Sequence, residues 1–431
     1  MDTTMLAARR DRALGAGAPL FYDRPIHIVR GEGTYLFDAE GRRYVDMYNN
    51  VPCVGHANPH VVEAMARQQA TLNVHSRYLH EGIVALAERL AALHGPAIES
   101  VVFSCSGTEA NEVALRIARG ATGRQGIVCT NATYHGNSEA VGKMTRIGEA
   151  PGSGHNSQGD VRAIPFPETL RPLVPGASEA ELAEAYLERL RGVIRGFEED
   201  GTGFAGLIVC SIFANEGLPD VPAGFMARAA EMVRAAGGLV IADEVQAGYA
   251  RTGRWWGYEG AGFTPDIVVT GKPMGNGLPL AATAASKALV DGFRARTRYF
   301  NTFASSPLQA AVGMAVLDVI ERDGLLDNVA RVGAALKAAL AERKPRCAAI
   351  GDVRGHGLFI GVEMVKGGDA LDPDPEQAIA VVNRLKDRGF LTSNAGAFRN
   401  VVKIRPPLVF ARHDADAFLE AFDATIAEID G

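Results

Sequence analysis

The sequence predicts an α/β protein in which a large, doubly wound and mostly parallel sheet domain stands beside a smaller α+β domain. Between about residues 59 and 305, short apolar runs alternate with segments of helical periodicity, which is typical of such a sheet. The runs are apolar throughout, as in strands that helices cover on both faces. A chain of 431 residues, 47% of them hydrophobic, can bury the core of one large domain and of a smaller partner.

Three stretches of the chain differ in character, and we take them as the domain organisation. Residues 1–58 hold short strand-like pieces between glycine turns, and we expect them to join the smaller domain. Residues 59–307 form the large domain. Residues 308–431 begin with an amphipathic helix and continue with strand-like pieces and closing helices, which predicts the smaller domain. The stretch 146–178 is rich in Gly, Pro and Ser, which is typical of a long loop.

The expected elements of the large domain follow one another along the chain. Buried strands are expected at residues 101–106, 126–130, 206–211, 239–244 and 266–270. Amphipathic helices are expected at residues 60–72, 83–93, 109–120, 179–200 and 223–237. The expected strands are apolar at nearly every position, whereas in the expected helices apolar residues recur at helical spacing. This difference distinguishes strand from helix.

Composition and charge exclude several classes of protein. The net charge is −6 at pH 7 and no basic stripe is present, which argues against a nucleic-acid partner. No apolar run reaches the roughly 18 residues of a membrane helix, and the N-terminus lacks the apolar centre of a secretory signal. The five cysteines are scattered, without the spacing of a disulfide framework or a zinc site. We therefore expect a cytoplasmic protein without a metal centre and without nucleic-acid or membrane partners.

Two expected strands end in residues that together suit one cofactor. The strand at 239–244 ends in an acidic pair that includes Asp243, and the next strand is followed by Lys272 in a glycine-rich segment. Ligands of an open parallel sheet bind outside the carboxyl ends of its strands. Pyridoxal phosphate needs a lysine for its Schiff base and a carboxylate beside its pyridinium nitrogen. Taken singly, Asp243 fits a helix cap and Lys272 a solvated lysine, but together they predict a pyridoxal-phosphate site.

Two further segments contain candidate cofactor contacts. Ser106, Gly107 and Thr108 stand at the expected start of a helix, where free N–H groups and hydroxyls can bind a phosphate. An ordinary N-cap explains the same residues. Tyr134 could stack on an aromatic cofactor and His135 could contact the cofactor or the substrate, although a surface turn, taken alone, explains them better.

Arg405 is the candidate for substrate binding, because it ends a late strand before two prolines. An arginine in such a place can hold a carboxylate by two hydrogen bonds, and an ion pair within the fold explains it equally well. Arg399 and Arg412 are the other candidates for this role. The zinc-protease, P-loop and α/β-hydrolase motifs are absent from the sequence, and no dinucleotide-binding G-x-G-x-x-G follows an expected strand.

Taken together, these segments resemble the class III pyridoxal-phosphate aminotransferases, which have fold type I. The resemblance covers the chain from about residue 20 to its end and rests on six motifs in order. They are SGTEANEVALRIAR, YHG, IADEVQAGYARTG, GKPMGNGLP, FNTF and KIRPPL. Within the class, the sequence is most similar to a subgroup that contains phosphoethanolamine and phosphohydroxylysine phospho-lyases and related bacterial aminotransferases.

The resemblance implies a role for each residue that matches a family motif. Lys272 would form the Schiff base and move the proton between substrate Cα and cofactor C4′. Asp243 would keep the pyridinium nitrogen protonated. Tyr134 and Val245 would hold the ring between them, with Gln246 near its 3-oxygen.

Other implied roles concern the cofactor phosphate and the substrate. The segment 106–108 would bind the phosphate, and Thr302 would reach it from the neighbouring subunit, so that the active site requires a homodimer. Arg405 would bind the substrate carboxylate. In some relatives a glutamate pairs with this arginine, and Glu216, one place from the usual position, is our candidate for that role.

The sequence also suggests the character of the substrate pocket and the type of reaction. Leu278 replaces a histidine that is common in the subgroup and, with Trp255, favours a more apolar substrate pocket, although packing explains Trp255 equally well. We predict a transaminase of the ω type that moves an amino group from a primary amine or ω-amino acid to a 2-oxo acid such as pyruvate or 2-oxoglutarate. A phospho-lyase acting on a phosphorylated amino alcohol and an amino-acid racemase or epimerase are the alternatives, and a binding protein without activity is the remote one.

Overall fold

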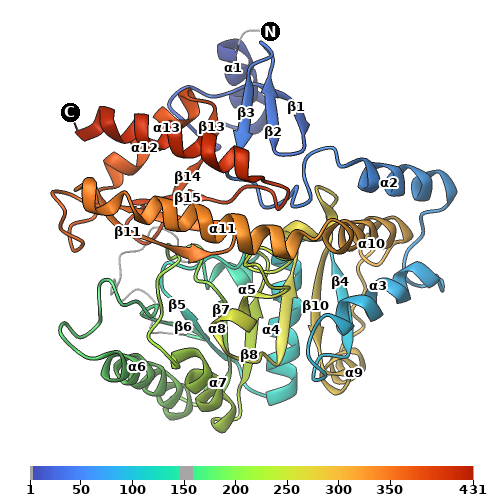
Figure 1. Ribbon diagram of the computed structural model, residues 1–431. Coiled ribbons are helices and arrows are strands. Elements are labelled where there is room, and N and C mark those ends of the chain that lie inside the picture. Colours follow the sequence, from blue (N-terminus) through green and yellow to red (C-terminus); the bar gives the residue numbers. More distant parts are fainter. Residues whose placement is uncertain (1–2, 146–158, 431) are drawn as a thin grey trace.

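A computed structural model of the chain describes residues 3–145 and 159–430, which form one seven-stranded sheet and two four-stranded sheets (Figure 1). The large sheet has the strand order β4-β10-β9-β8-β7-β5-β6. Its strands are β4 (Ser100–Ser104), β5 (Gly126–Thr130), β6 (Val161–Ile164), β7 (Phe204–Cys210), β8 (Leu239–Asp243), β9 (Ile267–Thr270) and β10 (Ala281–Ala285). Only β10 runs antiparallel to its neighbours within this described sheet, so the predicted mostly parallel sheet is confirmed.

Helices cover both faces of the large sheet. The α-helices described between residues 59 and 296 are α2 (Pro59–Thr71), α3 (Glu81–Ala92), α4 (Gly107–Thr122), α5 (Glu139–Gly142), α6 (Glu179–Glu199), α7 (Phe225–Ala235), α8 (Gly257–Ala261) and α9 (Lys287–Arg296). Neighbouring strand residues alternate between two core clusters: Ile127 and Cys129 pack with the apolar side of α4, while Val128 packs with that of α6. This alternation is the reason why the strands are apolar at every position.

The two small sheets lie on one side of the large sheet, together with both described ends of the chain (Figure 1). One sheet contains β1 (Ile28–Glu32), β2 (Tyr35–Asp38), β3 (Arg43–Asp46) and β13 (Phe390–Leu391), and the other contains β11 (Ile350–His356), β12 (Phe359–Met364), β14 (Ser393–Ala395) and β15 (Val401–Ile404). The helices of these parts are α1 (Thr3–Leu14), α10 (Pro307–Arg322), α11 (Leu325–Ala341), α12 (Pro375–Asp387) and α13 (Arg412–Asp430). Because β3 pairs in parallel with β13, N-terminal strands share a sheet with the C-terminal part of the chain. The domain limits at residues 58 and 307 stay a prediction.

Two strands of the large sheet were not expected from the sequence. Strand β6 has four residues and lies within the stretch 146–178, whose content of Gly, Pro and Ser favoured a loop. Residues 146–158 of that stretch lie outside the described residues. Strand β10 consists of alanine and threonine and has weak strand propensity. It forms because it is fully buried between β4 and β9 and pairs with both.

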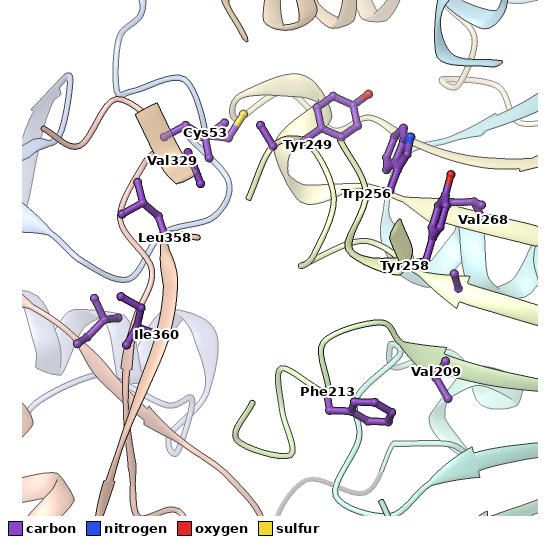
Figure 2. Close-up of a cluster of buried hydrophobic side chains, with 14 of the residues drawn as sticks. Cys53, Val209, Phe213, Tyr249, Trp256, Tyr258, Val268, Val329, Leu358 and Ile360 are labelled. Atoms are coloured by element: carbon purple, nitrogen blue, oxygen red, sulfur yellow. The ribbon is translucent and has the colours of Figure 1, made fainter. Parts of the chain in front are cut away.

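A continuous apolar core joins the large sheet to the C-terminal strands. Figure 2 shows Val209 of β7, Tyr249 and Trp256 from the segment after β8, and Leu358 and Ile360 at the start of β12, and all of them belong to one cluster of buried side chains. This core fixes the segment that follows β8, which carries part of the candidate site. Among the described helices, none combines the length and the apolar character that a membrane span requires.

Candidate active site

The carboxyl ends of β8 and β9 bring the predicted acid and lysine to one edge of the sheet. These strands are parallel neighbours, with Asp243 paired to Val269. Asp243 is the last residue of β8, and Lys272 begins a short 3-10 turn after β9. Both line a cavity of about 320 Å³. The same cavity is lined by the predicted cofactor contacts Ser106, Gly107, Thr108, Tyr134, His135, Val245 and Gln246.

Three donors fix the buried Asp243 carboxylate. His135 Nδ1 lies 2.7 Å from Oδ2, and Asn111 Nδ2 donates to the same oxygen at 3.0 Å. The backbone N–H of Val245 donates to Oδ1 at 3.0 Å. Since an ionised carboxylate only accepts hydrogen bonds, its contact with His135 places a proton on Nδ1. The carboxylate is therefore held in one orientation at the wall of the cavity.

Lys272 lies in the turn between β9 and β10, with its side chain at the same cavity. Burial, followed by the nearby charge of Arg405, lowers the pKa of the Lys272 amine below its usual range, while Asp243 acts in the opposite direction. A lowered pKa increases the neutral fraction of the amine, which is its nucleophilic form. The turn relies on Asn276 and Gly277, which both have positive φ.

The start of α4 forms a cradle for an anion. The Ser106 hydroxyl oxygen caps the helix by accepting a backbone hydrogen bond at 3.2 Å, and the first backbone N–H groups of this 16-residue helix have no helical acceptors. A Cβ atom at Gly107 would lie 3.0 Å from Val245 Cγ2, and one at Gly136 would lie 2.6 Å from Thr108 Oγ1. Glycine is therefore required for this close packing. The lysine, the fixed carboxylate and the cradle together fit pyridoxal phosphate.

Arg405 is held beside this cavity by neutral partners. Its side chain is 3% exposed, its Nε donates to the backbone oxygen of Tyr48 at 3.0 Å, and Nη1 donates to Gln246 Oε1. Burial lowers the pKa of the Arg405 guanidinium from its usual value. The other two arginine candidates, Arg399 and Arg412, are exposed. Of the three candidates, Arg405 is the buried one and contacts a predicted cofactor residue, Gln246.

Lys403 is a second cation that sequence reasoning missed. It lies on β15, two residues before Arg405, which directly follows the strand, and residues two apart in an extended chain leave the same face. Lys403 is 8% exposed, and its amine makes no hydrogen bond or ion pair with any described residue. Burial, with the charges of Arg405 and Lys272, keeps the pKa of Lys403 well below its usual value. The signal in the sequence was a lysine within the otherwise apolar run VVKI.

Three predicted site residues do not line the cavity. Thr302 is exposed, next to the exposed Phe303. Trp255 is partly buried and packs against the main core cluster. Glu216 is buried away from solvent, and its Oε1 accepts a hydrogen bond of 2.6 Å from Thr130 Oγ1. Their proposed roles in phosphate or substrate binding therefore rest on the sequence.

The expected pairing of Glu216 with Arg405 is absent from the described part of the chain. A tight turn after Glu216 explains where its side chain lies. Gly217 and Leu218 both have positive φ, and Arg354 Nε donates to the Gly217 carbonyl at 2.9 Å. These contacts fix the backbone beside Glu216, whose carboxylate is held by Thr130. Gln246 takes the place next to the arginine that the sequence assigned to the glutamate.

A pyridoxal-phosphate site at the strand ends of a doubly wound sheet defines a pyridoxal-phosphate enzyme of fold type I. The chain belongs to the class III aminotransferases, since the family described as Aminotransferase class-III matches residues 21–426. This match confirms the family resemblance and pyridoxal phosphate as the cofactor.

Individual relatives include both aminotransferases and phospho-lyases. The Drosophila melanogaster protein named alanine–glyoxylate aminotransferase 2-like is 36% identical over 419 residues, which covers 96% of this chain and 85% of the relative. The Caenorhabditis elegans protein named ethanolamine-phosphate phospho-lyase homolog 1 is 32% identical, over an alignment that covers 97% of this chain and 92% of the relative. A solved phospholyase from Arthrobacter, in complex with phosphoethanolamine, is 38% identical with a TM-score of 0.93 and covers 98% of this chain and 99% of its own.

Proposed function

We propose that the protein is an aminotransferase of the ω type, which moves an amino group from a primary amine or ω-amino acid to a 2-oxo acid. The observation that carries this proposal is the pair of buried cations, Arg405 and Lys403, beside Lys272. A buried cation without a counter-charge is costly, and a bound carboxylate removes that cost. Every 2-oxo acid acceptor supplies such a carboxylate.

The side chains of the site have separate tasks in this reaction. Bound pyridoxal phosphate supplies a carbonyl group that takes up the amino group and a ring that stabilises negative charge on the adjacent carbon. Lys272 Nζ, with its lowered pKa, accepts the proton from the donor carbon and returns it. Asp243, held by His135 and Asn111, keeps a proton on the ring nitrogen. Arg405 binds the carboxylate and so orients the bond that faces Lys272.

A phospho-lyase is the second candidate, and one observation favours it. The Arthrobacter phospholyase structure, which contains phosphoethanolamine, matches nearly the whole chain. A phosphate group could also pair with Arg405 and Lys403. Against it, Val51, Leu278 and Leu280 give the cavity an apolar side that offers nothing to a phosphate group.

A substrate panel separates these reactions. We expect the loaded enzyme to turn over an ω-amino acid repeatedly only when pyruvate, glyoxylate or 2-oxoglutarate is present, with one new amino acid formed for each donor used. Chromatography of the amino acids and a phosphate assay measure the outcome, with enzyme lacking cofactor as the control. Phosphate release from phosphoethanolamine without an oxo acid would contradict the proposal and support the lyase. Exchange of the donor's Cα proton without an oxo acid would support a racemase or epimerase.

We also propose a homodimer whose active sites are shared between subunits. Thr302 lies in a loop that Asn301 joins to the start of α4, through a 2.9 Å hydrogen bond to Glu109. Near this loop, Phe303 and Leu79 expose large apolar side chains, as interface residues do. The predicted cytoplasmic location remains a prediction.

Mixed dimers test whether Thr302 serves the neighbouring subunit. We expect Thr302→Glu and Lys272→Ala to be inactive separately, because the first repels the phosphate and the second lacks the amine. When the two variants are refolded together, random pairing makes about half of the dimers mixed, and each mixed dimer has one intact site of two. About a quarter of wild-type activity should therefore return. Size-exclusion chromatography confirms the dimers. If mixing restores no activity although dimers exchange, Thr302 does not act across the interface.

A further inference from the structure

We propose that Tyr48 is a positioning residue for substrate anions, because its ring holds Arg405 and Lys403 in place beside the cavity. This inference rests on the proposed function and narrows it: the site selects substrates that carry an anionic group. It assigns a specificity role to a residue that lies outside the cofactor contacts.

The two cations lack a carboxylate partner among the described residues. The Arg405 guanidinium donates to the uncharged oxygens of the Tyr48 backbone and of the Gln246 side chain, and the nearby Asp46 carboxylate favours its charged form. Within residues 3–145 and 159–430, Lys403 forms no ion pair, and Glu216 is held elsewhere by Thr130. Two like charges that are this deeply buried repel one another, so the charged form of the Lys403 amine needs an attractive neighbour.

The Tyr48 ring is placed to attract both cations. Lys403 Nζ lies 5.5 Å from its centroid and Arg405 Cζ lies 5.3 Å from it. A second ring, that of Phe359, lies 5.0 Å from Arg405 Cζ. The negative face of an aromatic ring attracts a cation within about 6 Å, and more strongly where water is excluded. The ring can keep both cations in place while an anion binds to them, whereas a glutamate would have to be displaced.

Contacts on both sides hold the ring in this position. The backbone N–H of Tyr48 donates to Asp46 Oδ1 at 3.0 Å. On the solvent side, the ring of Phe21 packs edge-on against Tyr48, with the centroids 4.7 Å apart. Tyr48 therefore cannot swing away from the cations without breaking a packed aromatic contact.

The absence of a glutamate partner has a consequence for selectivity. A glutamate that paired with Arg405 would neutralise it whenever a substrate without an acidic group was bound. Here an uncharged amine brings no negative charge to Arg405 and Lys403, so the free-energy cost of burying them remains when it binds. Donors with a carboxylate or a phosphate group should therefore be preferred over simple amines, in addition to the 2-oxo acid.

Binding of an unreactive carboxylate tests the role of the ring directly. We expect Tyr48→Leu to weaken propionate binding to the loaded enzyme about tenfold, which corresponds to about 1.4 kcal/mol and lies within the cation–π range for desolvated sites. Tyr48→Phe keeps the ring and should bind propionate within about twofold of wild type. Calorimetry measures the dissociation constants. This readout needs no turnover, so it stays informative even if the enzyme proves not to be an aminotransferase.

Kinetics and a matched control complete the test. Tyr48→Leu should raise KM for the 2-oxo acid and leave KM for an uncharged primary amine unchanged. Phe37→Leu removes another ring under an arginine, 3.6 Å from Arg30 and outside the candidate site, and should change neither constant. Tyr48→Met, of similar volume, replaces the leucine variant if that variant melts early. Unchanged propionate binding in the leucine and methionine variants, or equal weakening in the phenylalanine variant, overturns the proposal.

Discussion

Replacing Lys272 by alanine is expected to lower kcat/KM by about 10³-fold or more, because proton transfer by a positioned side chain alone is worth about 10²–10⁴-fold. The amine lies at the cavity wall, in the turn that follows the strand next to that of Asp243. Its lowered pKa makes the neutral, reactive form available near neutral pH. The variant should still bind the cofactor through the cradle at the start of α4, but without a covalent link.

Borohydride reduction followed by mass spectrometry checks the covalent link without measuring turnover. In the wild-type enzyme the cofactor should stay attached to the peptide that contains Lys272. In the variant no peptide should carry the cofactor. Lys287→Ala is the matched control, since Lys287 is an exposed lysine on α9 that pairs with Asp291. A small primary amine added to the alanine variant should restore part of the activity. If Lys272→Ala keeps full turnover, our assignment of the catalytic amine is wrong.

The residues that the sequence placed correctly are those defined by local pattern. Asp243 and Lys272 each end an apolar run, and a run of that length in an alternating α/β chain is a buried parallel strand. The strands' order in the sheet then follows from short connections, and neighbouring carboxyl ends meet. Ser106 could be placed for the same reason, because a cap precedes its helix by one position.

The residues that were missed depend on packing between distant segments. Lys403 is a buried lysine without an ion pair among the described residues because β15 lies between β12 and β14 and next to the site. Asn111 reaches Asp243 across 132 residues of sequence, and no pattern in its helix predicts that contact. The side chain of Glu216 lies against Thr130 for a related reason: a backbone turn at the next two residues, held by the distant Arg354, fixes the segment, and the role of Glu216 stays a prediction.

The largest effect on stability is expected from Glu363, which lies in a buried network of charges away from the cofactor residues. Its carboxylate accepts hydrogen bonds from Arg354 Nη2, from Arg171 Nη2 at 2.5 Å and from Asn400 Nδ2 at 2.6 Å. Arg354 also holds the backbone of Gly217, so the network joins β11 and β12 to the loop after β7. Removing one partner from such a group leaves buried charges unpaired.

Glu363→Gln should therefore reduce the free energy of unfolding by about 3–5 kcal/mol, the usual cost of breaking a buried ion pair. Burial disfavours the ionised form, but Arg354, Arg171 and Asn400 outweigh it and lower the pKa of Glu363. The unfolded state then binds the proton more readily than the folded state. The contribution of Glu363 is thus fully present above the unfolded pKa of about 4.3 and is lost as the pH falls through the lower folded pKa.

Urea unfolding followed by circular dichroism measures this difference, at pH 7 and again at acidic pH. Glu188→Gln is the matched control, because Glu188 makes the same kind of pair with Arg191 on the exposed face of α6. An exposed pair contributes about 0–1 kcal/mol, so the control should unfold almost as wild type does. The gap between the two variants should narrow in acid, where Glu363 of the wild type is protonated as well. A gap below about 1 kcal/mol at pH 7 would mean that water or neighbouring groups compensate Arg354 and Arg171, and that the network does not hold the loop after β7 in place.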